Sequence, residues 1–112
     1  GCSALASVTI PNSVTEIGNC IFKDCSSLTS IVVDIANEYY DSRGNCNAVI
    51  ETSTNRLLFG CKNTTIPNSV TGIEWYAFEG HSSLTSINIP NSVTEIRGFA
   101  FKGSALYNNP AN

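Results

Sequence analysis

The sequence predicts a repeat solenoid, mainly β, of about four coils of ~23 residues, with short parallel strands and one β-hairpin insertion. The hexapeptide Ile-Pro-Asn-Ser-Val-Thr begins at Ile10, Ile66 and Ile89, and its last two copies are one unit apart. The block Ser-Ser-Leu-Thr-Ser-Ile begins at Ser26 and again at Ser82. In every copy of the hexapeptide, a phenylalanine follows the proline at the same interval: Phe22, Phe78 and Phe101. One such unit cannot bury its own apolar side chains, whereas stacked units share a continuous core.

Each unit is expected to begin with a strand that ends just before or at the hexapeptide. In residues 84–89, the apolar Ile87 and Ile89 alternate with Ser86 and Asn88, so the two pairs face opposite sides of a strand. The proline that follows has no backbone donor and ends the strand. Further inward positions on the return path are Val93, Ile96, Ala100 and Phe101.

The segment from Asp34 to Gly60 departs from the repeat. The interval between the first two hexapeptides, from Ile10 to Ile66, corresponds to one ordinary unit and one longer unit. Residues 48–51 and 56–59 are apolar-rich and flank Thr52-Ser53-Thr54-Asn55, which predicts a β-hairpin with a four-residue loop. A turn-rich stretch, residues 41–45, precedes it. The longer unit is therefore expected to be an ordinary coil enlarged by a hairpin.

Residues 25–31, 10–18 and 89–101 follow, almost letter for letter, the pattern Cys-Ser-Ser-Leu-Thr-Ser-Ile-x-Ile-Pro-Asn-Ser-Val-Thr-x-Ile-Gly-x-x-Ala-Phe. This pattern resembles the BspA-like leucine-rich repeat family. The resemblance implies that residues 1–112 form a single leucine-rich-repeat fragment, with a hairpin-bearing variant unit at about 34–60. It also implies an extracellular or cell-surface location and a role in adhesion to host matrix proteins or to other cells.

Composition excludes several functions. Only 13% of residues are charged and the net charge is −3, so no nucleic-acid partner is expected, because such binding needs clustered Lys and Arg. No apolar run reaches the ~18–20 residues that span a bilayer, so no membrane span is expected in this chain. The sequence contains no Met, and we expect it to be a processed or excised piece of a longer repeat array. Apolar residues at its first coil, Leu5 and Val8, predict end-to-end self-association.

No catalytic, cofactor or metal site is predicted. His81 is the only histidine, it occupies a variable position at the start of a unit, and the sequence fixes no carboxylate beside it. None of the five cysteines forms a C-x-x-C motif, so neither a zinc ribbon nor a redox pair is indicated. The chain is therefore not expected to be an enzyme or to need a cofactor.

The oxidation state of the cysteines stays open. Cys2 and Cys25 are in register and should stack in neighbouring coils, either as a reduced ladder or as a disulfide. Cys20 aligns with Tyr76 and Phe99 and is expected to be half-buried. Cys46 and Cys61 bracket the hairpin, and an alternative is that they pair across its base.

Two groups of residues are candidates for contact with a partner. Trp75 replaces Asn19 and Gly98 of the other units at a position expected to face solvent, and aromatic side chains are enriched in binding hot spots. Tyr39, Tyr40 and Arg43 form a second cluster of residue types that interfaces favour, although the tyrosines could simply cover the root of the hairpin. The outward strand face adds Ser7, Thr9, Val32, Asp34, Ser86 and Asn88.

The leading hypothesis is a non-enzymatic extracellular module for adhesion or protein–protein recognition, with a host matrix or other cell-surface protein as its partner. Stacked strands present equivalent residues at regular spacing, which suits an extended contact. One alternative is a structural spacer without a ligand of its own. The other is a weak carbohydrate-binding module, for which Trp75 and Tyr39 are the supporting residues.

Overall fold

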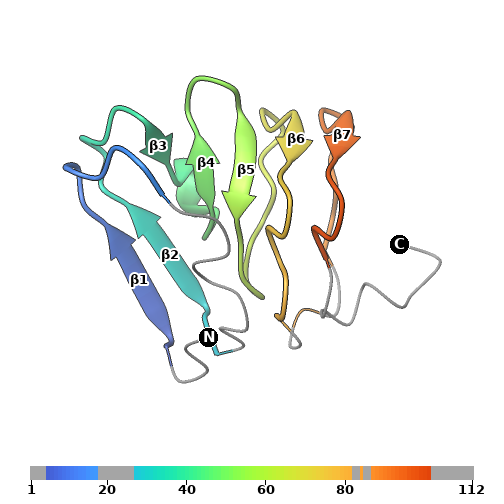
Figure 1. Ribbon diagram of the computed structural model, residues 1–112, viewed down its shortest axis with the longest axis horizontal. Helices are drawn as coiled ribbons and strands as arrows, with labels where there is room; N and C mark the ends of the chain where they lie inside the picture. The colour runs from blue at the N-terminus through green and yellow to red at the C-terminus, as the bar shows by residue number, and fades with distance from the viewer. Residues whose placement is uncertain (1–4, 18–26, 82–83, 85–86, 102–112) are drawn as a thin grey trace.

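The computed structural model describes residues 5–17, 27–81, 84 and 87–101, and their regular secondary structure consists mostly of short strands (Figure 1). Within these residues, two strands form one parallel sheet and five form a second sheet in the order β3-β4-β5-β6-β7. A single 3-10 turn, η1, covers Arg43–Asn45. The strands are β1 (Ser7–Ile10), β2 (Ser30–Val33), β3 (Tyr40–Asp41), β4 (Val49–Glu51), β5 (Arg56–Phe59), β6 (Gly72–Ile73) and β7 (Glu95–Ile96).

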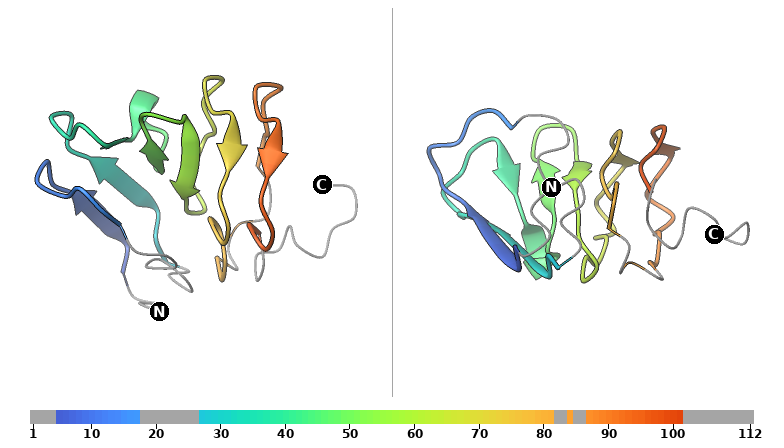
Figure 2. Two further views of the ribbon diagram at one scale, coloured as in Figure 1. Left: turned by 45° about the horizontal axis from the view of Figure 1, so that its top comes forward. Right: turned by 60° about the horizontal axis from the view of Figure 1, so that its bottom comes forward.

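Adjacent coils are stacked in the register that the repeat predicts. Strand β1 pairs in parallel with β2 so that Ser7 lies opposite Ser30, and β6 pairs in parallel with β7 so that Gly72 lies opposite Glu95. Each residue thus lies opposite its equivalent one unit further along the chain. Figures 1 and 2 show the chain advancing from β1 at one end to β7 at the other. The predicted β-rich repeat fold with short parallel strands is therefore present.

The position of the strand within the coil differs between the two ends of the molecule. Strands β1 and β2 lie where the sequence predicts them, but β6 and β7 lie on the Val-Thr-x-Ile part of the coil. The described residues of the predicted strand at 84–89 are not in a strand. The hairpin explains the change: its second strand, β5, offers its free edge to Gly72 and Ile73, so the parallel ladder continues from there.

The predicted hairpin is confirmed and is larger than expected. Strands β4 and β5 pair antiparallel, with Glu51 opposite Arg56 across the predicted four-residue loop. The amide of Asn55 donates to the carbonyl of Glu51 at 2.9 Å, and Asn55 has a φ of 58°. Strand β3 adds to the other side of β4, also antiparallel. The longer unit thus inserts a three-stranded meander into the stack.

This insertion divides the strands into two sheets instead of one continuous ladder. The free edge of β2 meets side chains rather than another strand: the amide of Val33 donates to Ser42 Oγ at 2.9 Å, and that of Ile31 to Asn47 Oδ1 at 3.4 Å. The described residues do not form a closed solenoid. The predicted stack of parallel strands is therefore interrupted at the predicted insertion, because the hairpin-bearing unit supplies polar side chains where a plain coil would supply a backbone edge.

Asn37 fastens the long unit to the first coil. Its side-chain amide donates to the carbonyls of Pro11 and Val14, both at 3.0 Å. Its Oδ1 accepts from the amides of Tyr39 and Tyr40 at 2.8 and 2.9 Å. Asn37 is buried, and these four bonds satisfy the whole hydrogen-bonding capacity of its side chain.

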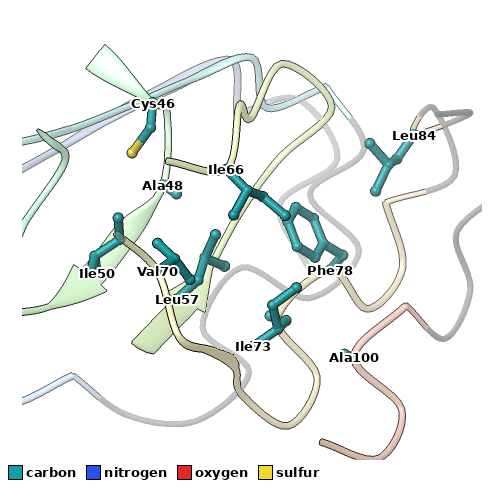
Figure 3. Close-up of a cluster of buried hydrophobic side chains, with 11 residues drawn as sticks. Cys46, Ala48, Ile50, Leu57, Ile66, Val70, Ile73, Phe78, Leu84 and Ala100 are labelled. Carbon is teal, nitrogen blue, oxygen red and sulfur yellow. The ribbon is translucent and has the colours of Figure 1, made fainter. Parts of the chain in front are cut away.

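Among the described residues, the buried apolar side chains form two clusters. One, shown in Figure 3, contains Ile66 and Val70 of the second hexapeptide together with Phe78, and Phe78 stacks on Phe101 with ring centroids 5.1 Å apart. The other contains Ile10, Leu28, Ile31, Val33, Tyr40, Val49, Phe59 and Cys61. Ile96 is an exception to the predicted inward positions, since nearly half of its surface is exposed, and no described coil follows it. Leu5 and Val8 are partly buried against the second cluster, and end-to-end association stays a prediction.

We expect Asn37→Asp to destabilise the chain by about 2–4 kcal/mol, because two buried donors become a carboxylate oxygen that faces two carbonyls. Urea unfolding followed by circular dichroism measures the change. Asn63→Asp is the matched control at an exposed asparagine and should change stability little. Equal effects of the two substitutions would contradict the role given to Asn37.

Candidate recognition surfaces

Arg43 is held inside the molecule's own polar network. Its Nε and Nη2 donate to the two carboxylate oxygens of Asp41, each at 2.6 Å, and its Nη1 donates to Asn55 Oδ1 at 2.8 Å and to Ser69 Oγ at 3.1 Å. The bidentate pair holds Arg43 against Asp41 in the turn before η1. The bonds to Asn55 and Ser69 then connect this turn to the hairpin loop and to the next coil. The geometry therefore gives Arg43 a positioning role, while its side chain stays partly exposed, so the partner contact stays a prediction.

The charges of this network stabilise each other. Partial burial alone would raise the pKa of Asp41, but hydrogen bonds from Arg43 and Thr52 outweigh it and lower the pKa below its ordinary value. The hydrogen bonds to Asp41 likewise raise the pKa of Arg43. Both groups thus stay ionised through the neutral range.

The two predicted tyrosines have different environments. Tyr40 is only 7% exposed, lies in the second core cluster, and has a pKa raised by burial. Its prediction as a contact residue is therefore corrected: strand β3 turns it inward, where it covers the root of the hairpin. Tyr39, its neighbour in the chain, points the other way and is 52% exposed.

Three large side chains are exposed on β2 and on the segment that follows it, and we call them the β2-turn surface: Val32, Ile35 and Tyr39. Val32 is 46% exposed and Ile35 is fully exposed. A groove of about 550 Å³ is lined by residues 32–35 and 41–45, which include Val32 and Ile35 but not Tyr39. The carboxylate of Asp34 lies in this groove and accepts the amide of Ala36 at 2.9 Å.

Trp75 is 50% exposed, which confirms the predicted exposure of that position. A Cβ added to Gly98, its equivalent in the next coil, would lie 2.6 Å from the indole, so the ring rests directly over the Gly98 backbone. The next pair in register, Tyr76 and Phe99, stacks with centroids 5.6 Å apart and planes tilted by 19°. The exposed aromatic side chains thus line up along the stack.

Charged residues beside these rings form a network that the sequence did not reveal. Arg56 pairs with Glu74 at 2.7 Å and also with Glu95, while Arg97 pairs with Glu74 at 3.1 Å. The hydrogen bond from Arg56 lowers the pKa of Glu95. Glu74 and Arg97 are one unit apart in the sequence. Their equivalent positions in successive units were the signal that could have identified them as partners.

The remaining strand-face candidates do not form one continuous surface. Ser7, Thr9 and Asp34 are exposed near the two-stranded sheet, whereas Asn88 is exposed on a segment that is not a strand. Asn88 borders two shallow hollows, one with Thr64, Thr65 and Ile66, the other with Asn68 and residues 89–92. Ser86 lies outside the described residues.

The cysteines of the hairpin unit are free, buried thiols. Cys46 and Cys61 do not pair with each other, so the disulfide alternative across the hairpin base is wrong. Cys61 instead lies against Asn47 and Thr64, and burial raises the pKa of both thiols. Cys2, Cys20 and Cys25, and with them the predicted ladder, lie outside the described residues.

The described residues contain no cluster of three or more His, Cys, Asp or Glu side chains that could hold a metal ion. His81 is buried at 2% exposure. Among the described parts of the chain, no helix is both long and apolar enough to cross a membrane.

Stacked coils of one repeating pattern with exposed, non-repeating side chains define a leucine-rich-repeat type of β-protein. Residues 51–109 match the family of the BspA type leucine rich repeat region (6 copies). The chain belongs to this family, which confirms the resemblance that the sequence predicts. A comparison with curated proteins gives no match.

Solved structures show the same fold. A leucine rich cell surface protein from Faecalibacterium prausnitzii is 33% identical, with a TM-score of 0.64 over 83% of this chain and 26% of that one. A leucine-rich repeat protein from Eubacterium ventriosum is 26% identical, with a TM-score of 0.72 over 88% and 27%. The pneumococcal vaccine antigen PcpA, 22% identical, shares the fold with a TM-score of 0.72 over 88% and 25%. This chain spans about a quarter of the length of each.

We expect Asp41→Asn to reduce the free energy of unfolding by about 1–2 kcal/mol at pH 7, because it removes the charged pair with Arg43. The effect is modest because this pair is partly solvated, and such pairs are weaker than buried ones. Because the folded pKa of Asp41 is lowered, its contribution is present above the unfolded pKa of ~4 and is lost as the pH falls through the folded value. The gap between variant and parent should therefore shrink between pH 7 and pH 3 in urea unfolding. The exposed Glu38→Gln serves as control. A gap independent of pH would contradict this account.

Cys46 and Cys61 should resist alkylation in the native chain, because a thiol must be both exposed and ionised to react. Iodoacetamide labelling at pH 8, followed by peptide mass spectrometry, should leave both residues unmodified until urea is added. The three other cysteines are scored separately in the same digest. Labelling of Cys46 or Cys61 as fast as in urea would show that this region opens in the native state.

Proposed function

We propose that this chain is a non-enzymatic recognition segment of a longer extracellular or cell-surface protein, and that it acts in adhesion. Membership of the BspA-type family supports the repeat architecture, and the similar Faecalibacterium protein is a cell surface protein. The observation that carries the proposal is the β2-turn surface, where Val32 and Ile35 are exposed at an open groove and Tyr39 is exposed four residues after Ile35. Scattered apolar residues need no explanation, but a group on one short segment beside a groove favours an interface.

The chemistry of this surface favours a protein as partner. Its centre is apolar and aromatic, whereas Asp34 places a carboxylate at the groove. Asp41 is neutralised by Arg43, so the net charge of the groove is negative. A host matrix or cell-surface protein with an apolar patch bordered by Lys or Arg would fit it.

Binding of the whole chain to immobilised matrix proteins, measured by surface plasmon resonance, tests the proposal. We expect Tyr39→Ala and Ile35→Ser each to weaken binding about tenfold or more, as for residues at the centre of an interface. Ile89→Ser is the matched control, since Ile89 is an exposed isoleucine in another coil.

Unchanged affinity of both variants would overturn this surface as the contact. Absence of binding to every matrix protein, with the chain folded by circular dichroism, would favour the alternative of a structural spacer. Arg43→Ala should weaken binding and also reduce stability, because Arg43 both lines the groove and holds the adjoining turn in place.

A further inference from the structure

A second concave site lies away from the β2-turn surface, and we call it the Trp75 pocket. It has a volume of about 190 Å³ and is lined by Ile17, Leu58, Phe59, Glu74, Trp75 and Tyr76. Strand β5 supplies Leu58 and Phe59, and the segment after β6 supplies Glu74, Trp75 and Tyr76. Drug-sized ligands usually occupy ~300–1,000 Å³. The pocket therefore suits a single ring.

The aromatic wall of the pocket is fixed before any ligand arrives. Trp75 lies over Gly98, where a side chain would collide with it, and Tyr76 is held by its stack on Phe99. Tyr76 and Phe99 have positive φ values, 61° and 58°, which is a conformation that bulky residues seldom adopt. The repeat of this conformation at equivalent positions of two successive coils shows that the coil itself turns these rings outward. Half of the indole remains open to solvent.

A fixed charged group stands beside the rings. Glu74 lines the pocket, and its carboxylate accepts hydrogen bonds from Arg56 at 2.7 Å and from Arg97 at 3.1 Å. A carboxylate can accept about four hydrogen bonds, so Glu74 keeps capacity for a ligand hydroxyl. The two arginines prevent it from turning away. Trp75 and Glu74 thus place a flat apolar surface next to a fixed acceptor.

This combination matches the chemistry of a pyranose. A pyranose ring has an apolar face of C–H groups, which packs on an aromatic plane, and a rim of hydroxyl groups, which donate to a carboxylate. A chain of protein would need a longer groove than one ring occupies, and a nucleic acid would need a positive surface. We propose that the Trp75 pocket binds a single neutral pyranose residue of a glycan, independently of the β2-turn surface.

Trp75 is the only tryptophan in the chain, so its fluorescence reports on this pocket alone. The whole chain is titrated with glucose, galactose, mannose and N-acetylglucosamine as methyl glycosides, and also screened on a glycan array. We expect a saturable change in emission for at least one sugar, with a dissociation constant in the millimolar range. Glu74→Gln should weaken that binding about fivefold or more while the tryptophan signal persists.

Further variants separate binding from folding. Trp75→Phe keeps a ring over Gly98 and should retain part of the glycan-array signal, whereas Trp75→Ala should abolish it. Tyr39→Ala should leave sugar binding unchanged, which also distinguishes this site from the proposed protein contact. Melting curves check that each variant is folded.

Two results would overturn the proposal. One is the absence of any saturable change in emission and of any array signal. The other is a change in emission that only a matrix protein produces, in which case the pocket receives a protein side chain instead of a sugar.

Discussion

The fixed register between successive coils is the constraint on which the rest of the structure depends. One coil is too thin to enclose a core, so every apolar side chain must find its neighbour in the next coil. The contacts between residues one unit apart follow this rule. Thr94 donates to the carbonyl of Thr71, Arg97 pairs with Glu74, and Phe101 stacks on Phe78. A residue is therefore stabilised chiefly by its own equivalent, and a substitution in one coil acts on two.

The hairpin unit is the place where this rule is interrupted, and the interruption shapes the surface. Because the meander separates the coils, β2 has no strand partner on one edge, and Ser42 and Asn47 satisfy its amides instead. Asn37 then anchors the departing chain to the first coil. The segment between these two fixed points is free of stacking requirements. That is why Ile35 can be exposed without loss to the core, and Tyr39, just after Asn37, is exposed as well.

The sequence was sufficient to predict the features of the fold that depend on periodicity. The recurring hexapeptides predicted the stacking, and the polar Thr52–Asn55 stretch between apolar runs predicted the hairpin, since both signals are local or strictly repeated. The sequence did not predict the pairing across the insertion, since β5 pairs with Gly72 and Ile73 of β6 and not with the predicted strand. For the same reason Tyr40 and Arg43 looked like surface residues. Their partners, in the core and at Asn55 and Ser69, lie at spacings that no repeat encodes.

Where two successive coils carry different residues at equivalent positions, the residues are complementary. This complementarity is relevant to whether the chain is a recognition module or a structural spacer. Trp75 is large where Gly98 in the next coil is small, and Glu74 is negative where Arg97 is positive. A spacer needs interchangeable coils, and such coils would carry the same residue at each of these positions. Here the coil that begins at Ile66 and its successor carry different residues at both positions. Paired departures of this kind are what a stack needs when it must hold an exposed aromatic ring and a carboxylate at a fixed place on its surface.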